Sequence, residues 1–252
     1  MNLDFDLHVH TFHSPCGQAE MRPAEIVNLA AQRGITRLGI SDHFYPFTDP
    51  GIFDEIRAAV DKARSLRNGS LEVYFGCEAE IMSPGRTAGS PGLAEDLDFV
   101  MAGATHFQNE GMTELPPASD DYAIAQHYLK MFEYAVSLPW VDTVAHPFFV
   151  VPGVCSVEVL DLIQDFDLLP ALELARGNEV AMEISPRAFR RSEQLRFSLR
   201  FYPLCKKAGL KFTIGSDAHQ LDDVGNVRIL QPLITELELT EKDFWLPESK
   251  TR

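Results

Sequence analysis

The sequence predicts an α/β fold in which short parallel strands alternate with helices. Seven short runs rich in Val, Ile, Leu and Phe have the composition of strands that are buried on both faces. Helical patterns separate these runs, and a His, Asp or Glu follows nearly every run. Because a barrel gathers functional groups from many strand ends at one mouth, these observations favour a distorted seven-stranded (β/α)7 TIM-like barrel. An open doubly wound sheet would leave several of these strand ends too far apart.

The predicted elements follow in order along the chain. Pro23 suits the first turn of a helix that Gly34 ends. Ser156 and Pro170 mark the starts of two shorter helices, and Thr240 is the predicted N-cap of a last short helix. The predicted strands cover residues 3–9, 37–40, 71–76, 98–104, 141–145, 179–184 and 211–214, and the longer helices cover 23–33, 54–66, 120–136 and 192–208.

Composition narrows the class of protein. A chain of 252 residues that is 45% hydrophobic can bury one large core, and no composition shift divides it. We therefore expect a single domain over residues 1–252. The net charge of −15 argues against long nucleic acid and against a polybasic membrane surface. It leaves an anionic substrate open, because clustered metal ions can reverse the local field.

Cysteine usage and the N-terminus indicate a compartment. The four cysteines Cys16, Cys77, Cys155 and Cys205 are scattered and form no Cys-x-x-Cys pair, so disulfides are not expected. The N-terminus shows no basic start with an apolar segment, and no apolar stretch approaches the ~18 residues of a membrane span. We expect a cytoplasmic protein without a membrane partner; the sequence does not define its oligomeric state.

Side chains at or just past the strand ends predict a metal cluster. His8 and His10 lie two apart on a strand and so share one face, and Asp217 and His219 repeat this spacing at the last strand. Imidazoles and carboxylates that converge in this way are typical ligands of divalent metals. The candidate ligands are His8, His10, His43, Glu78, His106, His146, Asp217 and His219.

The sequence also suggests roles for individual acids and histidines in and around the predicted ligand set. A buried acid such as Glu78 needs a partner, and a bridging position between two metals would supply it. Glu80 is expected either to contact a ligand from behind or to face solvent, and Glu183 is a candidate for a contact behind the ligands. His127 lies inside a predicted helix, where a core or surface role is expected, and His13 belongs to the first mouth loop.

Together these motifs resemble the PHP (polymerase and histidinol phosphatase) superfamily. The resemblance runs in order from residue 4 to about residue 226, through Asp6-Leu-His-Val-His-Thr11, Ser41-Asp-His43, Gly76-Cys-Glu78, His106, His146-Pro147 and Gly215-Ser-Asp-Ala-His219. It implies a distorted seven-stranded β/α barrel, two or three Zn, Mn or Fe ions, and hydrolysis of phosphoesters by a metal-bound hydroxide. By motif match, the eight candidate residues fall on metal-ligand positions of the family.

The first loop departs from the family pattern. A further acid or histidine is expected shortly after Ser14, but this chain has Pro15 and Cys16 there. Pro15 cannot coordinate a metal through its side chain, whereas Cys16 could serve as a soft ligand. The third metal position is therefore open, and the site holds either two ions or a third with altered preference.

Within the superfamily, the segment after Glu183 resembles the histidinol phosphatase branch. Arg187 has the position of an arginine in that branch, and Arg190 and Arg191 are nearby. Arg187 and Arg190 are candidate ligands of a substrate phosphate through bidentate hydrogen bonds, with a solvated loop as the alternative.

The function predicted from these residues is hydrolysis of a small phosphomonoester, a phosphorylated metabolite similar to histidinol phosphate. One alternative is a phosphodiesterase or 5'-3' exonuclease on nucleotides or short oligonucleotides, although such proteins usually show a basic track. A second is an amidohydrolase, which usually has a carboxylated lysine ligand, and no lysine ends a predicted strand here. The third is a non-catalytic metal-binding module.

Overall fold

A computed structural model describes residues 3–65, 71–109, 111–115, 120–189 and 191–248. Seven parallel strands form the sheet in the order β1-β2-β3-β5-β6-β7-β8, and the short strand β4 (Arg86–Thr87) pairs antiparallel with β3. The predicted seven-stranded α/β barrel is thus confirmed. The seven strands are β1 (Phe5–Val9), β2 (Arg37–Phe44), β3 (Glu72–Ser83), β5 (Phe99–Gly103), β6 (Thr143–Val144), β7 (Ala181–Ile184) and β8 (Phe212–Ile214).

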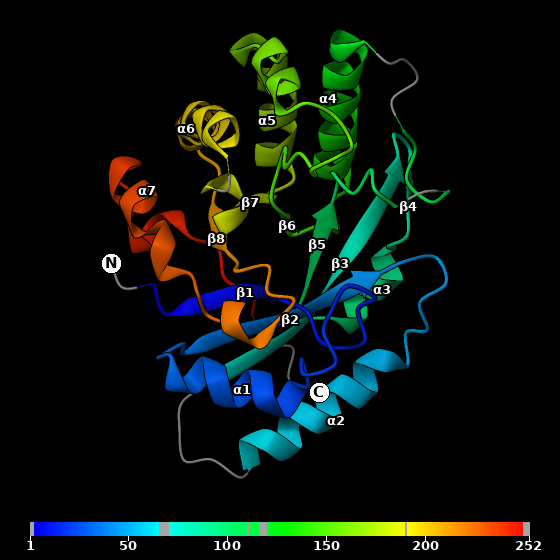
Figure 1. Cartoon of the computed structure of the whole chain (residues 1–252), viewed down its shortest axis with the longest axis vertical. Coiled ribbons are helices and arrows are strands. Elements are labelled where there is room, and N and C mark those ends of the chain that lie inside the picture. Colours follow the sequence, from blue (N-terminus) through cyan, green and yellow to red (C-terminus); the bar gives the residue numbers. More distant parts are fainter. Residues whose placement is uncertain (1–2, 66–70, 110, 116–119, 190, 249–252) are drawn as a thin grey trace.

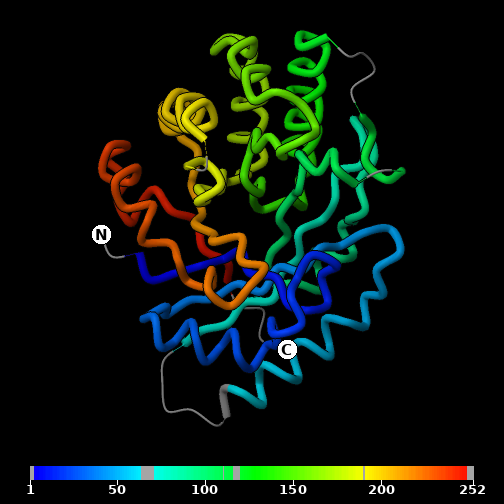
Figure 2. Tube along the Cα trace, viewed as in Figure 1, coloured from blue at the N-terminus to red at the C-terminus, as the bar shows by residue number. Residues whose placement is uncertain are grey.

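The barrel is nearly closed by contacts between its first and last strands. The backbone N–H of His10 donates to the carbonyl of Ala218 at 3.0 Å, and the N–H of Ala218 donates to the carbonyl of His8 at 3.3 Å. Figure 2 shows the orange segment after β8 beside the blue segment after β1. This seam brings the His8-x-His10 motif next to Asp217, although the two lie at opposite ends of the sequence.

Helices cover the outside of the barrel. In Figure 1, α1 and α2 lie along one side of the strands, and α4, α5 and α6 lie along the other. Thr240 caps a short 3₁₀ turn, Glu241–Asp243, through a capping box, as predicted. The helices are α1 (Pro23–Gln32), α2 (Ile52–Ser65), α3 (Pro91–Asp96), α4 (Asp121–Ser137), α5 (Asp165–Gly177), α6 (Ser192–Lys207) and α7 (Gln231–Glu236).

Several predicted boundaries were wrong. Pro170 does not begin a helix but lies inside α5, because a capping box between Gln164 and Asp167 starts the helix upstream. Ser156 precedes a 3₁₀ segment, Val157–Leu162, rather than an α-helix. The elements β4, α3 and α7 were not predicted.

Strands β2 and β3 extend well past their predicted ends. Their pairing continues to His43 opposite Glu78 and Phe44 opposite Ala79, so both candidate ligands lie inside strands and not just after them. The sequence hid this extension, because polar residues interrupt the apolar pattern that marks a buried strand. The consequence is a firmer support for the two side chains, since β3 pairs with the backbone of His43 on one side and Glu78 is paired with both β2 and β5.

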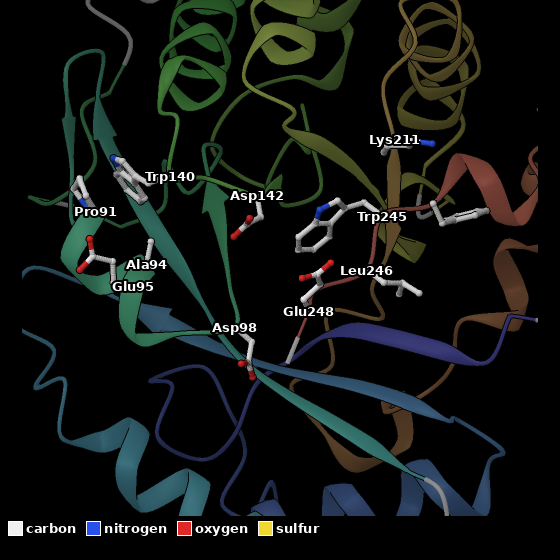
Figure 3. Close-up of a pocket in the computed structure, with 11 residues that line it drawn as sticks. Pro91, Ala94, Glu95, Asp98, Trp140, Asp142, Lys211, Trp245, Leu246 and Glu248 are labelled. Carbon is white, nitrogen blue, oxygen red and sulfur yellow. The ribbon is translucent and has the colours of Figure 1, made fainter. Parts of the chain in front are cut away.

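A cavity of about 830 Å³ lies at the opposite, amino end of the strands. Asp98, Asp142 and Lys211, which line it, directly precede β5, β6 and β8, and Trp140 and Trp245 form part of its wall (Figure 3). None of the eight candidate metal ligands lines this cavity. Within the described residues, no helix combines the length and apolar character needed to cross a bilayer.

Candidate metal centre

All eight predicted ligands meet at the carboxyl ends of the strands. They form four overlapping groups, and within each group the potential ligand atoms lie within 4.8 Å of one another. Seven of the side chains are buried and that of His219 is half-buried. The groups are His10, His43 and His219; His8, His10 and Asp217; His8, Glu78 and His146; and His43, Glu78 and His106.

Glu78 lies in the middle of this cluster. Its Oε1 is 3.2 Å from Nε2 of His146 and 3.4 Å from Nε2 of His106. Its Oε2 is 3.0 Å from Nδ1 of His43 and 3.4 Å from Nε2 of His8. Burial alone would raise the pKa of this carboxyl group, but the surrounding imidazoles hold the pKa well below its usual range. His10 Nε2 also lies 3.6 Å from Oε2, so Glu78 is an ionised carboxylate surrounded by five histidines.

The polar atoms at this point fit a bound cation. Both carboxylate oxygens of Glu78 and Nδ1 of His43 are buried, and although Oε2 and Nδ1 lie at ion-pair distance, none of the three atoms forms a hydrogen bond among the described residues. Unsatisfied buried polar atoms are rare in native proteins, and an ion is one explanation for them. Gly103 leaves the necessary space, because a Cβ there would lie 2.7 Å from Cε1 of His106 and 2.8 Å from Oε1 of Glu78. The donor set of imidazole and carboxylate matches Zn, Mn or Fe.

Asp217 forms the other acidic centre of the cluster. Its Oδ1 lies 3.4 Å from Nε2 of His10 and 3.7 Å from Nε2 of His8, and Nε of Arg187 donates to its Oδ2. Burial opposes ionisation, but His8, His10 and Arg187 lower the pKa of Asp217 well below its usual value. The backbone of Asp217 has φ 54°, and that of His146 has φ 26°. Such strained conformations of non-glycine residues concentrate at functional sites.

Two buried carboxylates support the imidazoles from behind. Oε1 of Glu183 is 2.8 Å from Nδ1 of His8, and its Oε2 accepts from the backbone N–H of His146 at 2.6 Å. Oε2 of Glu80 is 2.8 Å from Nδ1 of His106. A carboxylate on one ring nitrogen fixes the tautomer and directs the other nitrogen toward a metal. The predicted contacts of Glu80 and Glu183 behind the ligands are therefore present.

These carboxylates also set the pKa values of the histidines. Burial lowers the pKa of His8, but the charges of Glu183 and Glu78 raise it well above its usual value. For His106, burial is likewise outweighed by Glu78 and Glu80, which raise the pKa to about 9. Burial and the neighbouring His43 lower the pKa of His10 well below its usual value. The negative charge of these carboxylates therefore favours binding of a cation in the cluster, either a proton or a metal ion.

Two aspartates that hold the site together were not assigned roles from the sequence. Asp42 accepts from the N–H of Thr11 at 2.7 Å, from Oγ1 of Thr11 at 2.7 Å and from Oγ of Ser14 at 2.6 Å, which fixes the first loop. Asp6 is fully buried and accepts from the N–H groups of Ser216 and Gly225, each at 2.8 Å. Burial raises the pKa of Asp6 to about 6. Asp6 and Asp42 both lie within motifs that carry the resemblance to the PHP superfamily. That position in the sequence could have indicated their role in holding the site together.

Other predicted residues lie outside the four groups. Cys16 is exposed and belongs to none of them, so no described contact makes it a ligand. His13 stacks on Phe12 at the first loop. His127 is buried in α4, where its Nε2 donates to the carbonyl of Glu114 at 2.8 Å, in agreement with a structural role. Arg187 reaches the cluster, whereas Arg190 lies outside the described residues.

Known proteins resemble this chain in sequence and in fold. A "Probable phosphatase" of Caldicellulosiruptor bescii is 25% identical over 240 residues, which cover 94% of this chain and 89% of the relative. One of Caldicellulosiruptor saccharolyticus is 26% identical over the same length, with 94% and 89% covered. The histidinol phosphate phosphatase of Lactococcus lactis, solved with zinc, L-histidinol and phosphate, is similar in fold, with a TM-score of 0.63, 16% identity and 94% of both chains covered.

A family model gives the decisive assignment. The PHP domain model matches residues 6–157, which is more than half of the chain and includes six of the eight candidate ligands. The barrel and the order of its motifs agree with this match. The extent of a single domain over residues 1–252 stays a prediction. The chain belongs to the PHP domain family.

Proposed function

We propose that this protein hydrolyses a small phosphomonoester at the metal centre formed by the eight candidate ligands. The observation that carries the proposal is Glu78, a buried carboxylate whose oxygens face five imidazoles and form no hydrogen bond in the described part of the chain. Phosphatase is the broad assignment, and relatives named probable phosphatases align with 94% of the chain.

Each residue of the cluster has a role in holding ions. Glu78 belongs to two of the four groups, so two ions would share it, and His8, His10 and Asp217 would complete the shell on the seam side. Divalent ions held there would polarise a phosphoryl oxygen and lower the pKa of water toward about 7. Zn, Mn and Fe all suit these ligands, and zinc is the metal named for the Lactococcus lactis structure.

Arg187 is proposed to bind the substrate phosphate. Its guanidinium carries five N–H donors, of which Nε donates to Asp217. The group lies 5.4 Å above the ring of Phe149, and its side chain is 18% exposed at the mouth of the cluster. Asp217 and Phe149 thus hold the guanidinium in one orientation, with donors left for phosphate oxygens.

Replacing Arg187 by glutamine is expected to raise the KM for a monophosphate about tenfold or more. A hydrogen bond to a charged group contributes about 1.5–3 kcal/mol, and each 1.4 kcal/mol corresponds to a factor of about ten. Steady-state kinetics at saturating metal measure the change. Arg196→Gln on α6 is the matched control, because that arginine is exposed and pairs with Asp161. An unchanged KM in Arg187→Gln would remove this residue from the phosphate site.

The proposed substrate is a small phosphorylated metabolite similar to histidinol phosphate. The support is the barrel shared with the Lactococcus lactis enzyme, whose structure holds L-histidinol and phosphate. The net charge of −15 favours a small substrate over a long nucleic acid, which usually needs a basic track.

A panel of monophosphates that includes histidinol phosphate tests the function. The protein is assayed with Mn, Zn or Fe, beside Asp217→Ala and a dinucleotide as diester substrate. Rapid release of phosphate from a monophosphate, lost in the variant, is the expected result. Hydrolysis of the dinucleotide alone would establish a diesterase instead. Metal binding without turnover of either substrate class would identify a non-catalytic module.

A further inference from the structure

We propose that Thr113 is a positioning residue of the metal centre, which acts through Glu80 on His106. This inference rests on the metal-holding part of the proposed function, but it concerns binding of an ion and not hydrolysis. Thr113 touches none of the ligand atoms in the contacts described above. It controls the orientation of a histidine by satisfying the carboxylate behind that histidine.

The contact geometry assigns one partner to each oxygen of Glu80. Oε1 accepts from Oγ1 of Thr113 at 2.5 Å, and Oε2 lies 2.8 Å from Nδ1 of His106. The side chain of Glu80 is fully buried, and Thr113 is 4% exposed. Water therefore has little access to replace either partner. The three side chains form a buried chain from Thr113 to the imidazole.

The backbone around Thr113 is anchored to the barrel on two sides. The N–H of Glu114 donates to the carbonyl of Met82 on β3 at 2.7 Å, and the carbonyl of Glu114 accepts from His127 of α4 at 2.8 Å. The N–H of Thr113 donates to the carbonyl of Asn109 at 3.0 Å. These bonds hold the hydroxyl of Thr113 at a fixed position relative to Glu80, and they explain what the buried His127 does.

Loss of the Thr113 hydroxyl would leave Oε1 of Glu80 buried without a partner. A buried oxygen left without a hydrogen bond is costly, so the carboxylate of Glu80 turns toward another donor. This rotation weakens the contact between Oε2 and Nδ1 of His106. That contact fixes the tautomer in which Nε2, which faces Glu78 at 3.4 Å, carries a free lone pair. The expected effect is weaker binding of the ion that His106 holds.

The effect should be confined to part of the centre. His106 occurs in only one of the four groups, together with His43 and Glu78. On the other side, Glu183 supports His8 and accepts from the backbone N–H of His146, with no involvement of Thr113. Thr113 therefore influences the ion of the His43, Glu78 and His106 group, and leaves the ion beside His8 in place.

The experiment titrates metal-free protein with Zn or Mn against a competing chelator and counts the bound ions. Thr113→Val is expected to lower the affinity for one ion by about 10–100-fold, the usual effect of removing a group behind a ligand. The affinity for the tightest-bound ion should stay unchanged. Thr113→Ser, which keeps the hydroxyl, should restore wild-type binding. Glu80→Gln should lower the affinity for the same ion, and it is the second variant if Thr113→Val does not fold.

The matched control is Thr143→Val. Thr143 is also fully buried, but in the described part of the chain its hydroxyl hydrogen-bonds to that of Thr213, at 3.1 Å, and not to Glu80 or Glu183. Wild-type metal affinities in Thr113→Val and Glu80→Gln, or an equal loss in Thr143→Val, would overturn the proposal. Failure of the proposed function looks different: the wild type would then bind its ions and show the Thr113 effect, yet hydrolyse no monophosphate.

Discussion

Replacing Glu78 by glutamine is expected to reduce hydrolysis of the monophosphate by about 10³-fold or more. The amide removes a negative charge that two of the ligand groups share, and it places an NH₂ among the five imidazole nitrogens that approach this side chain. Metal-ion stabilisation of the transition state contributes several kcal/mol, and each 1.36 kcal/mol corresponds to about a factor of ten. The measurement is kcat/KM on the best monophosphate at saturating metal.

The control for this variant lies on the same strand. Glu72 begins β3, is exposed and accepts from the hydroxyl of Tyr74 at 2.9 Å. Glu72→Gln should therefore keep wild-type kinetics. Circular dichroism of Glu78→Gln should show a retained fold, because relief of a buried charge offsets the lost ion. A wild-type rate in Glu78→Gln would contradict the central role of this carboxylate.

Replacing Asp6 by alanine is expected to lower the free energy of unfolding by about 3 kcal/mol or more. Asp6 accepts from three backbone N–H groups, those of His8, Ser216 and Gly225, and all of these bonds are buried. Each buried donor left without a partner costs about 1–3 kcal/mol. Urea unfolding followed by circular dichroism measures the change. The variant should also bind metal more weakly, because Asp6 joins β1 to the segment that carries Asp217 and His219.

Asp4→Ala is the control for this effect, two residues away on the same segment. Asp4 is partly exposed and pairs with Arg37 at 3.1 Å, with a second contact from the hydroxyl of Thr36 at 2.8 Å. Partly exposed pairs of this kind contribute about 1 kcal/mol or less. Equal losses of stability in Asp4→Ala and Asp6→Ala would show that the backbone donors around Asp6 do not depend on its carboxylate.

The convergence of the eight candidate side chains could be predicted from the sequence, because their positions at strand ends follow local rules. His8 and His10 share a face of β1 since side chains two apart on a strand point the same way. The apolar runs located all seven barrel strands, and the repeated polar residue after a run indicated which ends would meet. The resemblance of the ordered motifs then identified the family, which the match over residues 6–157 shows.

The supporting contacts depended on the tertiary structure. The seam between β1 and the segment after β8 joins His10 to Ala218, and Asp6 bonds to Gly225 across more than 200 residues of sequence. The orientation of Arg187 toward Asp217 is likewise set by packing between separate segments. Local patterns carry no information on such pairs, because their geometry arises only when the barrel closes.

The sequence by itself therefore determined the barrel and the family, and it placed the eight candidate side chains at strand ends that meet; their role as metal ligands stays a prediction. The tertiary structure alone decided which carboxylate supports which imidazole, as with Glu183 behind His8 and the chain from Thr113 through Glu80 to His106. It also decided that β2 and β3 continue through His43 and Glu78. The physical reason is that ligand identity follows from side-chain chemistry and strand periodicity, whereas ligand orientation follows from buried hydrogen bonds between distant segments.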